Sequence, residues 1–555
     1  MNDIRRTILW VIFGFSMVLL WDQWQIHNGH KATFFPKAVP TAVADKAASA
    51  ASPAAAASAL ADPGQVPTAG AAVAAVHDYV DVSTDVYKLR FDTEGGSLVR
   101  AELVRHPSME NSQQPFVLFD ESKDRVYVAQ TGLIGAQWPT HKSPMRFVGE
   151  RVLKDGQNSI ALRFESEDVG GIKLVKTYTL QRGSYAIGVK HEVINKGAAA
   201  VSPQLYLQLV RDGNKPAGES SFYSTFTGPA VYTEAKKYHK VDFEDIAKNK
   251  AEIDKQSNNG YVAMVQHYFA SAWLLGEGIA RENFVRKVDN NLYAVGMITP
   301  LGEVSPGQSK VLENVLFAGP QEEKVLESLA PGLELLKDYG WLAMLAKPLF
   351  WLLDQLHKVI QNWGWSIMAL VLLLKIAFYW LNAKAYASMA KMKAINPRIM
   401  EMRQRLKDNP QQMQMEMMKI YREEKVNPMG GCFPMLIQIP VFIALYWVLL
   451  STVEMRHAPW VGWIVDLSAK DPYYILPIVM TLTTLLQTAL NPAPPDPMQA
   501  KMMWIMPLAF SVMFFYFPAG LVLYWITNNV LSIAQQWIIN TRLGVPPQFN
   551  LPKFR

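Results

Sequence analysis

The chain has 555 residues, of which 50% are hydrophobic and 18% are charged, with a formal net charge of +6 and a single cysteine. One cysteine excludes an internal disulfide and any cysteine-based zinc or iron–sulfur site. The hydrophobic residues gather in long, nearly uninterrupted runs, which excludes a purely soluble enzyme, a disordered chain and a fibrous protein. The runs are Thr7–Trp21, Gly364–Leu381, Cys432–Leu450, Tyr473–Ala489 and Met502–Trp537. We therefore expect a polytopic α-helical membrane protein with a large water-facing part.

The N-terminal segment 1–27 places Arg5 and Arg6 before the first hydrophobic run. A cleaved signal peptide is the alternative, but tryptophans and an aspartate follow the run, where small residues would mark a cleavage site. We expect an uncleaved anchor whose amino end is cytoplasmic. Residues 28–77 are rich in Ala, Pro, Ser and Thr, and such a composition cannot bury enough apolar surface to offset its ordering entropy. This segment should be a flexible linker.

Residues 78–335 change to a period of two, as in Ile172–Leu180 and Tyr185–Val193. Alternation of β-branched and aromatic residues with polar ones, broken by glycine and asparagine turns, predicts an antiparallel β-sandwich. About 250 residues are enough for one large β domain with its own core. Because this domain follows an anchor with a cytoplasmic amino end, we expect it on the far side of the membrane.

Segment 336–362 should form an amphipathic helix. Lys347, Asp354 and Lys358 recur on one helical stripe, and leucines occupy the opposite face. A strongly one-sided helix with aromatic edges is typical of a helix lying in the membrane interface. The alternative is a helix packed on the β domain.

Segment 363–540 should hold five membrane spans. The last hydrophobic run is nearly twice as long as one crossing and should split into two helices at Phe517–Gly520. The loop within 384–427 carries ten Lys and Arg residues, whereas the loop Val453–Pro472 carries two. The positive-inside rule then predicts six transmembrane helices with both termini, including the basic tail 541–555, in the cytoplasm.

The basic loop 384–427 should form a helical hairpin, because a turn at Asp408–Pro410 separates two helix-forming stretches. Its many methionines offer adaptable apolar surface for varied partners, but they could equally pack the two helices together. Its charge could attract anionic lipid or ribosomal RNA, and lipid is the simpler explanation. No DNA partner is expected. The hairpin residues singled out are Met413, Met417, Lys419 and Arg422.

Lys375 lies near the middle of a predicted span, where a lysine costs about 2.5–3.5 kcal/mol. Snorkelling works best near helix ends, and the predicted spans contain no Asp or Glu to pair with it. We therefore expect a hydrated cavity around a functional cation, although each wall residue could instead make a plain interhelical hydrogen bond. Candidates for the wall are Gln438, Thr481, Thr483, Gln487, Ser511, Trp525, Thr527, Asn528, Asn529, Ser532 and Gln535.

Other functional classes find little support in the sequence. Ion-coupled transporters usually use intramembrane carboxylates, which the predicted spans lack. The chain has no Walker loop, no nucleophile elbow and no histidine pair at metal-binding spacing. We therefore expect no catalytic residues, no metal and no cofactor.

Three segments resemble the hallmark sequences of the YidC/Oxa/Alb family of membrane protein insertases. They are KVNPMGGCFPMLIQIP at Lys425–Pro440, DPYYILP at Asp471–Pro477 and FPAGLVLY at Phe517–Tyr524. The anchor, the linker and the large β domain resemble the Gram-negative form. The resemblance covers the whole chain.

The resemblance implies a periplasmic β-supersandwich similar to sugar mutarotases and a helical core with a hydrophilic groove in the bacterial inner membrane. Lys375 matches a position that is often arginine, so charge is kept but bidentate recognition is lost. Implied partners are nascent membrane protein clients, the Sec translocon, the ribosome and anionic lipid. The alternatives are a transporter or channel, or a sugar-binding or sugar-modifying enzyme acting through the β domain. Candidates for client contact are Phe433, Pro434, Pro440 and Met480.

Overall fold

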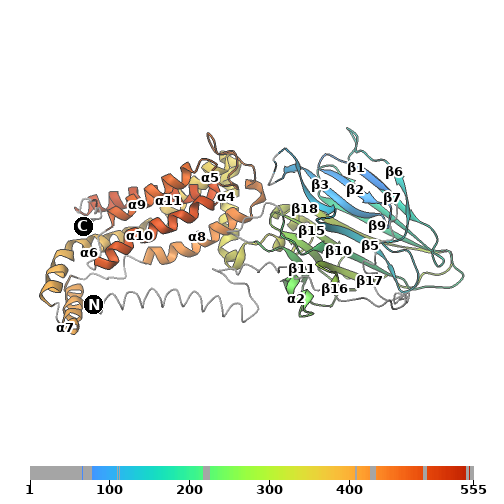
Figure 1. Ribbon diagram of the computed structural model, residues 1–555, viewed down its shortest axis with the longest axis horizontal. Coiled ribbons are helices and arrows are strands. Elements are labelled where there is room, and N and C mark those ends of the chain that lie inside the picture. Colours follow the sequence, from blue (N-terminus) through green and yellow to red (C-terminus); the bar gives the residue numbers. More distant parts are fainter. Residues whose placement is uncertain are drawn as a thin grey trace, which may run out of the picture.

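The computed structural model describes residues 66, 78–108, 111, 113–216, 225–406, 409–424, 433–491, 497–544 and 549. The predicted anchor in 1–27, nearly all of the linker and most of the tail 541–555 lie outside the described residues. Figure 1 shows an elongated molecule, with the helical part at one end and the β domain at the other.

The β domain consists of two nine-stranded sheets in which all strand pairs are antiparallel. In spatial order the first sheet is β1 (Tyr79–Ser83), β2 (Tyr87–Asp92), β3 (Ser97–Pro107), β4 (Pro115–Glu121), β5 (Val126–Ile134), β10 (Gln204–Asp212), β17 (Leu292–Pro300), β16 (Arg281–Asp289) and β13 (Gln256–Ser257). The second sheet is β12 (Lys237–Lys240), β11 (Gly228–Thr233), β14 (Tyr261–Gln266), β15 (Phe269–Leu275), β18 (Ser309–Pro320), β9 (Ala186–Asn195), β8 (Ile172–Gln181), β7 (Ser159–Ser166) and β6 (Met145–Gly149). The predicted antiparallel sandwich is confirmed.

The core of the β domain lies between the two sheets. Ile160, Leu162 and Phe164 alternate along β7 with exposed residues, as the period of two requires. Trp273 of the second sheet is fully buried, and its indole N–H donates to the carbonyl oxygen of Gln208 in the first sheet at 3.1 Å. This bond satisfies the polar atom of the largest core side chain and ties the sheets together.

The helical part follows the β domain in the chain, apart from two short helices, α2 (Phe243–Ala247) and α3 (Glu323–Leu329). Its helices are α4 (Ala343–Ile360), α5 (Trp363–Ala377), α6 (Tyr379–Arg405), α7 (Pro410–Glu423), α8 (Phe433–Ser451), α9 (Ile475–Leu490), α10 (Pro497–Met513) and α11 (Ala519–Arg542). Buried apolar residues of α4, α5, α8, α9 and α11 form a second hydrophobic core.

In the described part of the chain, no single helix is both long and apolar enough to cross a membrane. By length and composition, α5 taken together with the first part of α6 is the one stretch among these described helices that could do so, as a bent pair. Shorter apolar helical stretches are Gln438–Ser451, Ile475–Leu490 and Ala500–Tyr516.

The expectation of one continuous helix over Gly364–Leu381 is wrong. The helix breaks at Phe378, and the axis of α5 differs by 68° from that of the first part of α6, Tyr379–Met392. Neither glycine nor proline stands near the break, so the sequence carries no local signal for it. The predicted split of the last hydrophobic run is confirmed, since α10 ends at Met513 and α11 begins at Ala519 after Pro518.

Helix α4 packs against α5 and α8 through Ala346, Phe350 and Leu353. The predicted leucine face is only partly buried, because Leu345 is exposed. The polar stripe turns toward the β domain side: Asp354 pairs with Lys324 of α3 at 2.7 Å, and Lys347 lies 3.8 Å from Glu334. The helix therefore packs on the helical core and also contacts the domain that precedes it. Its position in the membrane interface stays a prediction.

A short segment between α8 and α9 joins the two parts of the molecule (Figure 1). Val453 belongs to the core of the β domain, and the guanidinium group of Arg456 donates to the carbonyl oxygen of Pro107 at the end of β3. The ring nitrogen Nε2 of His267, in the turn between β14 and β15, lies 2.9 Å from the carbonyl oxygen of Leu450. The β domain is thus held directly by the end of α8.

Candidate functional site

A small pocket lies between α5, α6, α8 and α11, with a volume of about 40 Å³. A water molecule needs about 10–15 Å³ measured in this way, so the pocket has room for a few waters. The lining residues are Val371, Leu374, Lys375, Phe378, Leu381, Asn382, Gln438, Val441, Tyr524 and Asn528. The predicted cavity around Lys375 thus corresponds to a pocket with both apolar and polar walls.

Lys375 lies in the last turn of α5, and its ammonium group donates to the hydroxyl oxygen of Ser532 at 2.7 Å. Ser532 is buried, and its own hydroxyl donates to the backbone carbonyl of Asn528 at 2.7 Å. No described carboxylate forms an ion pair with Lys375. The cation is therefore held by a neutral hydroxyl, which leaves its charge uncompensated.

One stripe of α11 supplies the polar partners of this pocket. Asn528 accepts a hydrogen bond from the side chain of Gln438 on α8 at 2.7 Å, and Gln535 accepts one from Asn382 on α6 at 3.2 Å. Asn528, Ser532 and Gln535 are spaced at i, i+4 and i+7, which places them on the same helical face. A single helix face therefore contacts α5, α6 and α8 through three side chains.

The neighbouring stripe of α11 faces α9 and serves helix packing. Asn529 donates to the hydroxyl oxygens of Thr483 and Thr484 at 3.2 and 2.9 Å. Gln536, seven residues further on, donates to the carbonyl oxygen of Leu490 at 3.4 Å. For Thr483 and Asn529 the alternative of a plain interhelical hydrogen bond is therefore the observed one.

Several predicted wall residues lie elsewhere. Trp525 packs edge-on against Phe442 at 4.8 Å and also contacts Phe514. Thr527 is buried, and its hydroxyl donates to the carbonyl oxygen of Leu523 in its own helix. Thr481 and Ser511 likewise donate to backbone carbonyls one turn earlier in their own helices. None of these four residues lines the pocket.

Two lining residues with polar side-chain groups, Asn382 and Tyr524, were missed from the sequence. Asn382 follows the break at Phe378, which brings the start of α6 to α11. Tyr524 is adjacent to Trp525, and neighbouring residues on a helix point about 100° apart. Only the rotation of α11 about its axis decides which of the two aromatic residues faces the pocket.

The residues expected to contact clients are in different surroundings. Met480 is 1% exposed, and its sulfur accepts a hydrogen bond from Thr484 at 3.4 Å, so a client would reach it only after the helices separate. Pro440 is half-buried within α8. The side chains of Phe433 and Pro434 lie outside the described residues.

The helical hairpin is confirmed as α6 and α7, and its methionines divide into two groups. Met413 and Met417 pack against a small core formed by Ile395, Ile399, Met402 and Ile420. Met415 and Met418 are instead 67% and 60% exposed, and they line a shallow groove with Lys419 and Arg422. The packing interpretation is thus confirmed for Met413 and Met417, whereas contact of Met415 and Met418 with partners stays a prediction.

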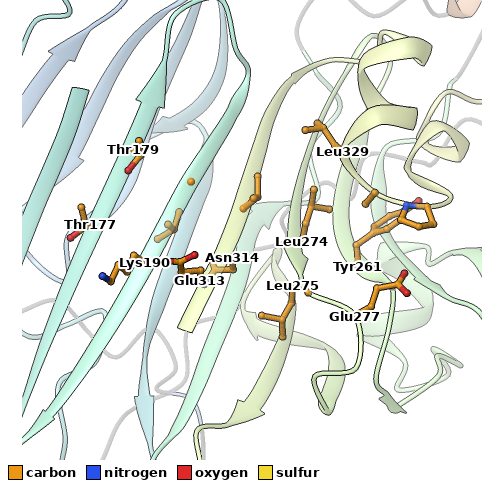
Figure 2. A pocket seen from close by; sticks show the side chains of 17 residues that line it. Thr177, Thr179, Lys190, Tyr261, Leu274, Leu275, Glu277, Glu313, Asn314 and Leu329 are labelled. Carbon is orange, nitrogen blue, oxygen red and sulfur yellow. The ribbon is translucent and has the colours of Figure 1, made fainter. Parts of the chain in front are cut away.

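The β domain carries a larger pocket of about 560 Å³ on the second sheet (Figure 2). Thr177, Lys190 and Glu313 from β8, β9 and β18 line one side, and Leu274 and Leu329 line the other. A sugar-modifying enzyme that uses acid–base catalysis would need a histidine and a carboxylate together in a cleft, and the lining of this pocket includes no histidine. Among the residues with assigned positions, no group of His, Cys, Asp and Glu is arranged to hold a metal ion.

Comparisons with known proteins cover nearly the whole chain. The YidC periplasmic domain matches residues 79–352, and the 60Kd inner membrane protein family matches residues 355–545. The chain is 55% identical to the membrane protein insertase YidC of Cupriavidus necator over 98% of both chains. It is 51% identical to the insertase of Burkholderia multivorans, over 98% of this chain and 99% of the relative. A solved structure of an active YidC insertase matches with 18% identity and a TM-score of 0.38, over 82% of this chain and 91% of that one.

Proposed function

The chain belongs to the YidC family of membrane protein insertases, and from this premise we propose that the pocket around Lys375 receives the polar segment of a client during insertion. The protein is an inner membrane insertase with a periplasmic β domain. Its relatives are named as insertases and not as enzymes, so the sugar-enzyme alternative is not favoured, and neither is the transporter or channel.

The observation that carries the proposal is the uncompensated charge of Lys375. A buried ammonium group paired with a carboxylate would present little net field, whereas the hydroxyl of Ser532 leaves the positive charge available. At an effective dielectric constant near 20, two unit charges about 4 Å apart attract each other by about 4 kcal/mol. An acidic or strongly polar client segment is therefore drawn toward this pocket.

The polar wall lowers the cost of carrying a client across the hydrocarbon. An unsatisfied amide or hydroxyl in an apolar medium costs about 2–7 kcal/mol, and Asn382, Gln438 and Asn528 offer donors and acceptors in its place. The apolar helix of the client then enters lipid, with a gain of about 25 cal/mol per Å² of apolar surface removed from water. In this scheme the attraction of the polar segment and the transfer of the apolar helix into lipid drive insertion.

We extend the proposal to topology and partners. Six membrane segments with both termini in the cytoplasm agree with the distribution of basic residues. The basic hairpin α6–α7 would then face the cytoplasm, where Lys419 and Arg422 meet anionic lipid or the ribosome. Cooperation with the Sec translocon is proposed from family membership.

The test compares Lys375→Met with Lys375→Arg in proteoliposomes. The client is a single-span protein made in two versions, with an acidic or a neutral translocated segment. We expect Lys375→Met to slow insertion of the acidic client at least about threefold more than that of the neutral one. Lys375→Arg should insert both clients at the wild-type rate. The matched control is Lys384→Met, since Lys384 lies near the pocket in sequence but its ammonium group packs over the ring of Trp380. Wild-type insertion of both clients by Lys375→Met would contradict the proposal.

A further inference from the structure

Val66 is a linker residue that packs on the β domain. It is 4% exposed and belongs to an apolar cluster with Ile134 of β5 and Tyr206 of β10. Phe284 of β16 and Ile298 of β17 pack against the same cluster. The composition of segment 28–77 predicts a linker that is flexible throughout, and Val66 departs from that expectation.

The surface that receives Val66 is the outer face of the first sheet. Leu205, Leu207 and Leu209 of β10 point into the core between the sheets, so Tyr206 and Gln208, which alternate with them, point outward. Strands β5, β10, β17 and β16 are consecutive neighbours in this sheet and carry the residues around Val66 (Figure 1). Val66 therefore belongs to an apolar cluster to which four adjacent strands contribute side chains.

A polar contact fixes the main chain of Val66. The guanidinium group of Arg286 donates to the carbonyl oxygen of Val66 at 3.0 Å and to the side-chain oxygen of Gln208 at 3.4 Å. Arg286 also lies over the ring of Phe284, at 5.3 Å from its centroid, and Gln208 in turn donates to Gln130 at 2.9 Å. Contacts with residues of the sheet thus orient the Arg286 side chain independently of its bond to Val66.

A glycine of the sheet shapes the same surface. A Cβ atom on Gly296 would lie 2.5 Å from Cζ of Phe284 and 2.9 Å from Cβ of Gln208. Only glycine lets the Phe284 ring lie across β17, and this ring forms one wall of the site.

We propose that this face of the first sheet is a docking site for the chain's own linker, in which the Val66 side chain fills the apolar cluster and Arg286 holds its carbonyl oxygen. The site accepts one apolar side chain together with one main-chain carbonyl, which is the chemistry of peptide recognition. Because the linker is part of the same chain, its effective concentration is on the order of millimolar, and a weak site is enough to hold it.

The chain length between Val66 and the sheet agrees with this docking. Strand β10 is five places from β1 in the sheet, or about 24 Å at 4.8 Å per strand. The twelve residue steps from Val66 to Asp78 can span up to about 40 Å. Docking at Val66 gives the chain a second attachment to the domain, at the middle of the first sheet, besides the edge strand β1.

Crosslinking of the full-length protein tests the proposal. In a Cys432→Ser background, which removes the native cysteine, Val66→Cys is combined with Ile298→Cys and treated with a short bismaleimide. The matched control combines Val66→Cys with Val311→Cys, because Val311 is an exposed residue of β18 in the other sheet. We expect the Ile298 pair to crosslink at least about tenfold faster, as the effective concentration of a docked linker requires. Equal rates for the two pairs would overturn the proposal.

Two further variants separate docking from folding. Arg286→Met should lower the Ile298 crosslink severalfold, whereas Arg163→Met, at an exposed site on β7, should leave it unchanged. Should Arg286→Met unfold the domain, Val66→Asp replaces it, since Val66 is outside every strand of the domain. Elastase should then cut near residue 66 faster in Val66→Asp than in wild type. An unchanged cleavage rate would also overturn the proposal.

Discussion

Ser532 accepts a hydrogen bond from Lys375 and donates one to the carbonyl oxygen of Asn528, each at 2.7 Å. The hydroxyl thereby holds the ammonium group at a fixed place on α11 without adding a negative charge. An aspartate at this position would neutralise the cation, and an alanine would leave it without this acceptor. The ammonium group of Lys375 is thus held in a fixed position while its positive charge is not neutralised.

We predict that Ser532→Ala destabilises the helical part by about 1–3 kcal/mol, because a buried ammonium group loses a hydrogen-bond acceptor. Thermal unfolding of the detergent-solubilised chain measures the effect. Ser511→Ala is the control, since the Ser511 hydroxyl donates only to Pro507 of its own helix, and it should change stability by no more than about 0.5 kcal/mol. Equal stability of the two variants would mean that water replaces Ser532 at no cost.

A second prediction concerns the hydrogen bond of Gln438 to Asn528, which joins α8 to α11 across the pocket. A pocket of about 40 Å³ is too small for a polypeptide, so client entry requires these helices to move apart. A disulfide between Gln438→Cys and Asn528→Cys, in the Cys432→Ser background, should therefore block insertion, and a reductant should restore it.

Proteoliposome insertion with and without reductant measures this block. The two single-cysteine variants are the controls, and each should insert clients independently of reductant. If the locked protein inserts clients normally, the client path lies outside the gap between α8 and α11.

The sequence predicted the helices and strands better than it predicted which way side chains face. Hydrophobic runs and alternation are patterns of neighbouring residues in the sequence. The β-sandwich, the hairpin and the split before Ala519 could therefore be predicted. The choice of Trp525 over Tyr524 was wrong, because it depends on the rotation of α11, which tertiary packing decides. The bend at Phe378 and the contact of Val66 with the sheet also have no local signal. The contacts observed there are made by residues distant in sequence: Asn382, just after the bend, donates to Gln535, and Arg286 donates to Val66.

A third prediction concerns the contact that joins the two parts of the molecule. Arg456 is buried, donates to Pro107, and lies 5.4–5.8 Å from the ring centroids of Phe116, Tyr268 and Phe269. Arg456→Met keeps the apolar volume but removes the hydrogen bond and the cation–π contacts, which together are worth about 2 kcal/mol. Backbone amides of the turn between β14 and β15 should then exchange with deuterium up to about thirtyfold faster, since about 1.4 kcal/mol corresponds to a factor of ten.

Hydrogen–deuterium exchange followed by mass spectrometry tests this prediction on the full chain. Arg163→Met provides the control, because its ion pair with Glu165 is exposed and remote from the helices. If the Arg456→Met variant showed unchanged exchange in the turn between β14 and β15, the two parts of the molecule would be held together mainly by Val453 and His267.

The last prediction concerns Lys176, which is 0% exposed in the core of the β domain. Its ammonium group donates to the carbonyl oxygens of Gly95 and Thr131, both at 2.6 Å, and burial lowers its pKa from 10.5 to about 7. Between these two values the unfolded chain holds a proton that the native state has released. Stability therefore rises with pH across this window, by up to about 1.4 kcal/mol per pH unit for this single group.

Denaturant unfolding of the full chain, followed by circular dichroism at about pH 7 and about pH 9, measures the rise. Burial also lowers the pKa of His191, and it lowers that of His141 to about 3, so both histidines titrate below this window. Lys176→Met removes the titrating group and should abolish most of the rise, while Lys190→Met, on the outer face at the pocket of Figure 2, should retain it. A rise of the same size in Lys176→Met would mean that Lys176 stays protonated in the folded core, held by its two carbonyl acceptors.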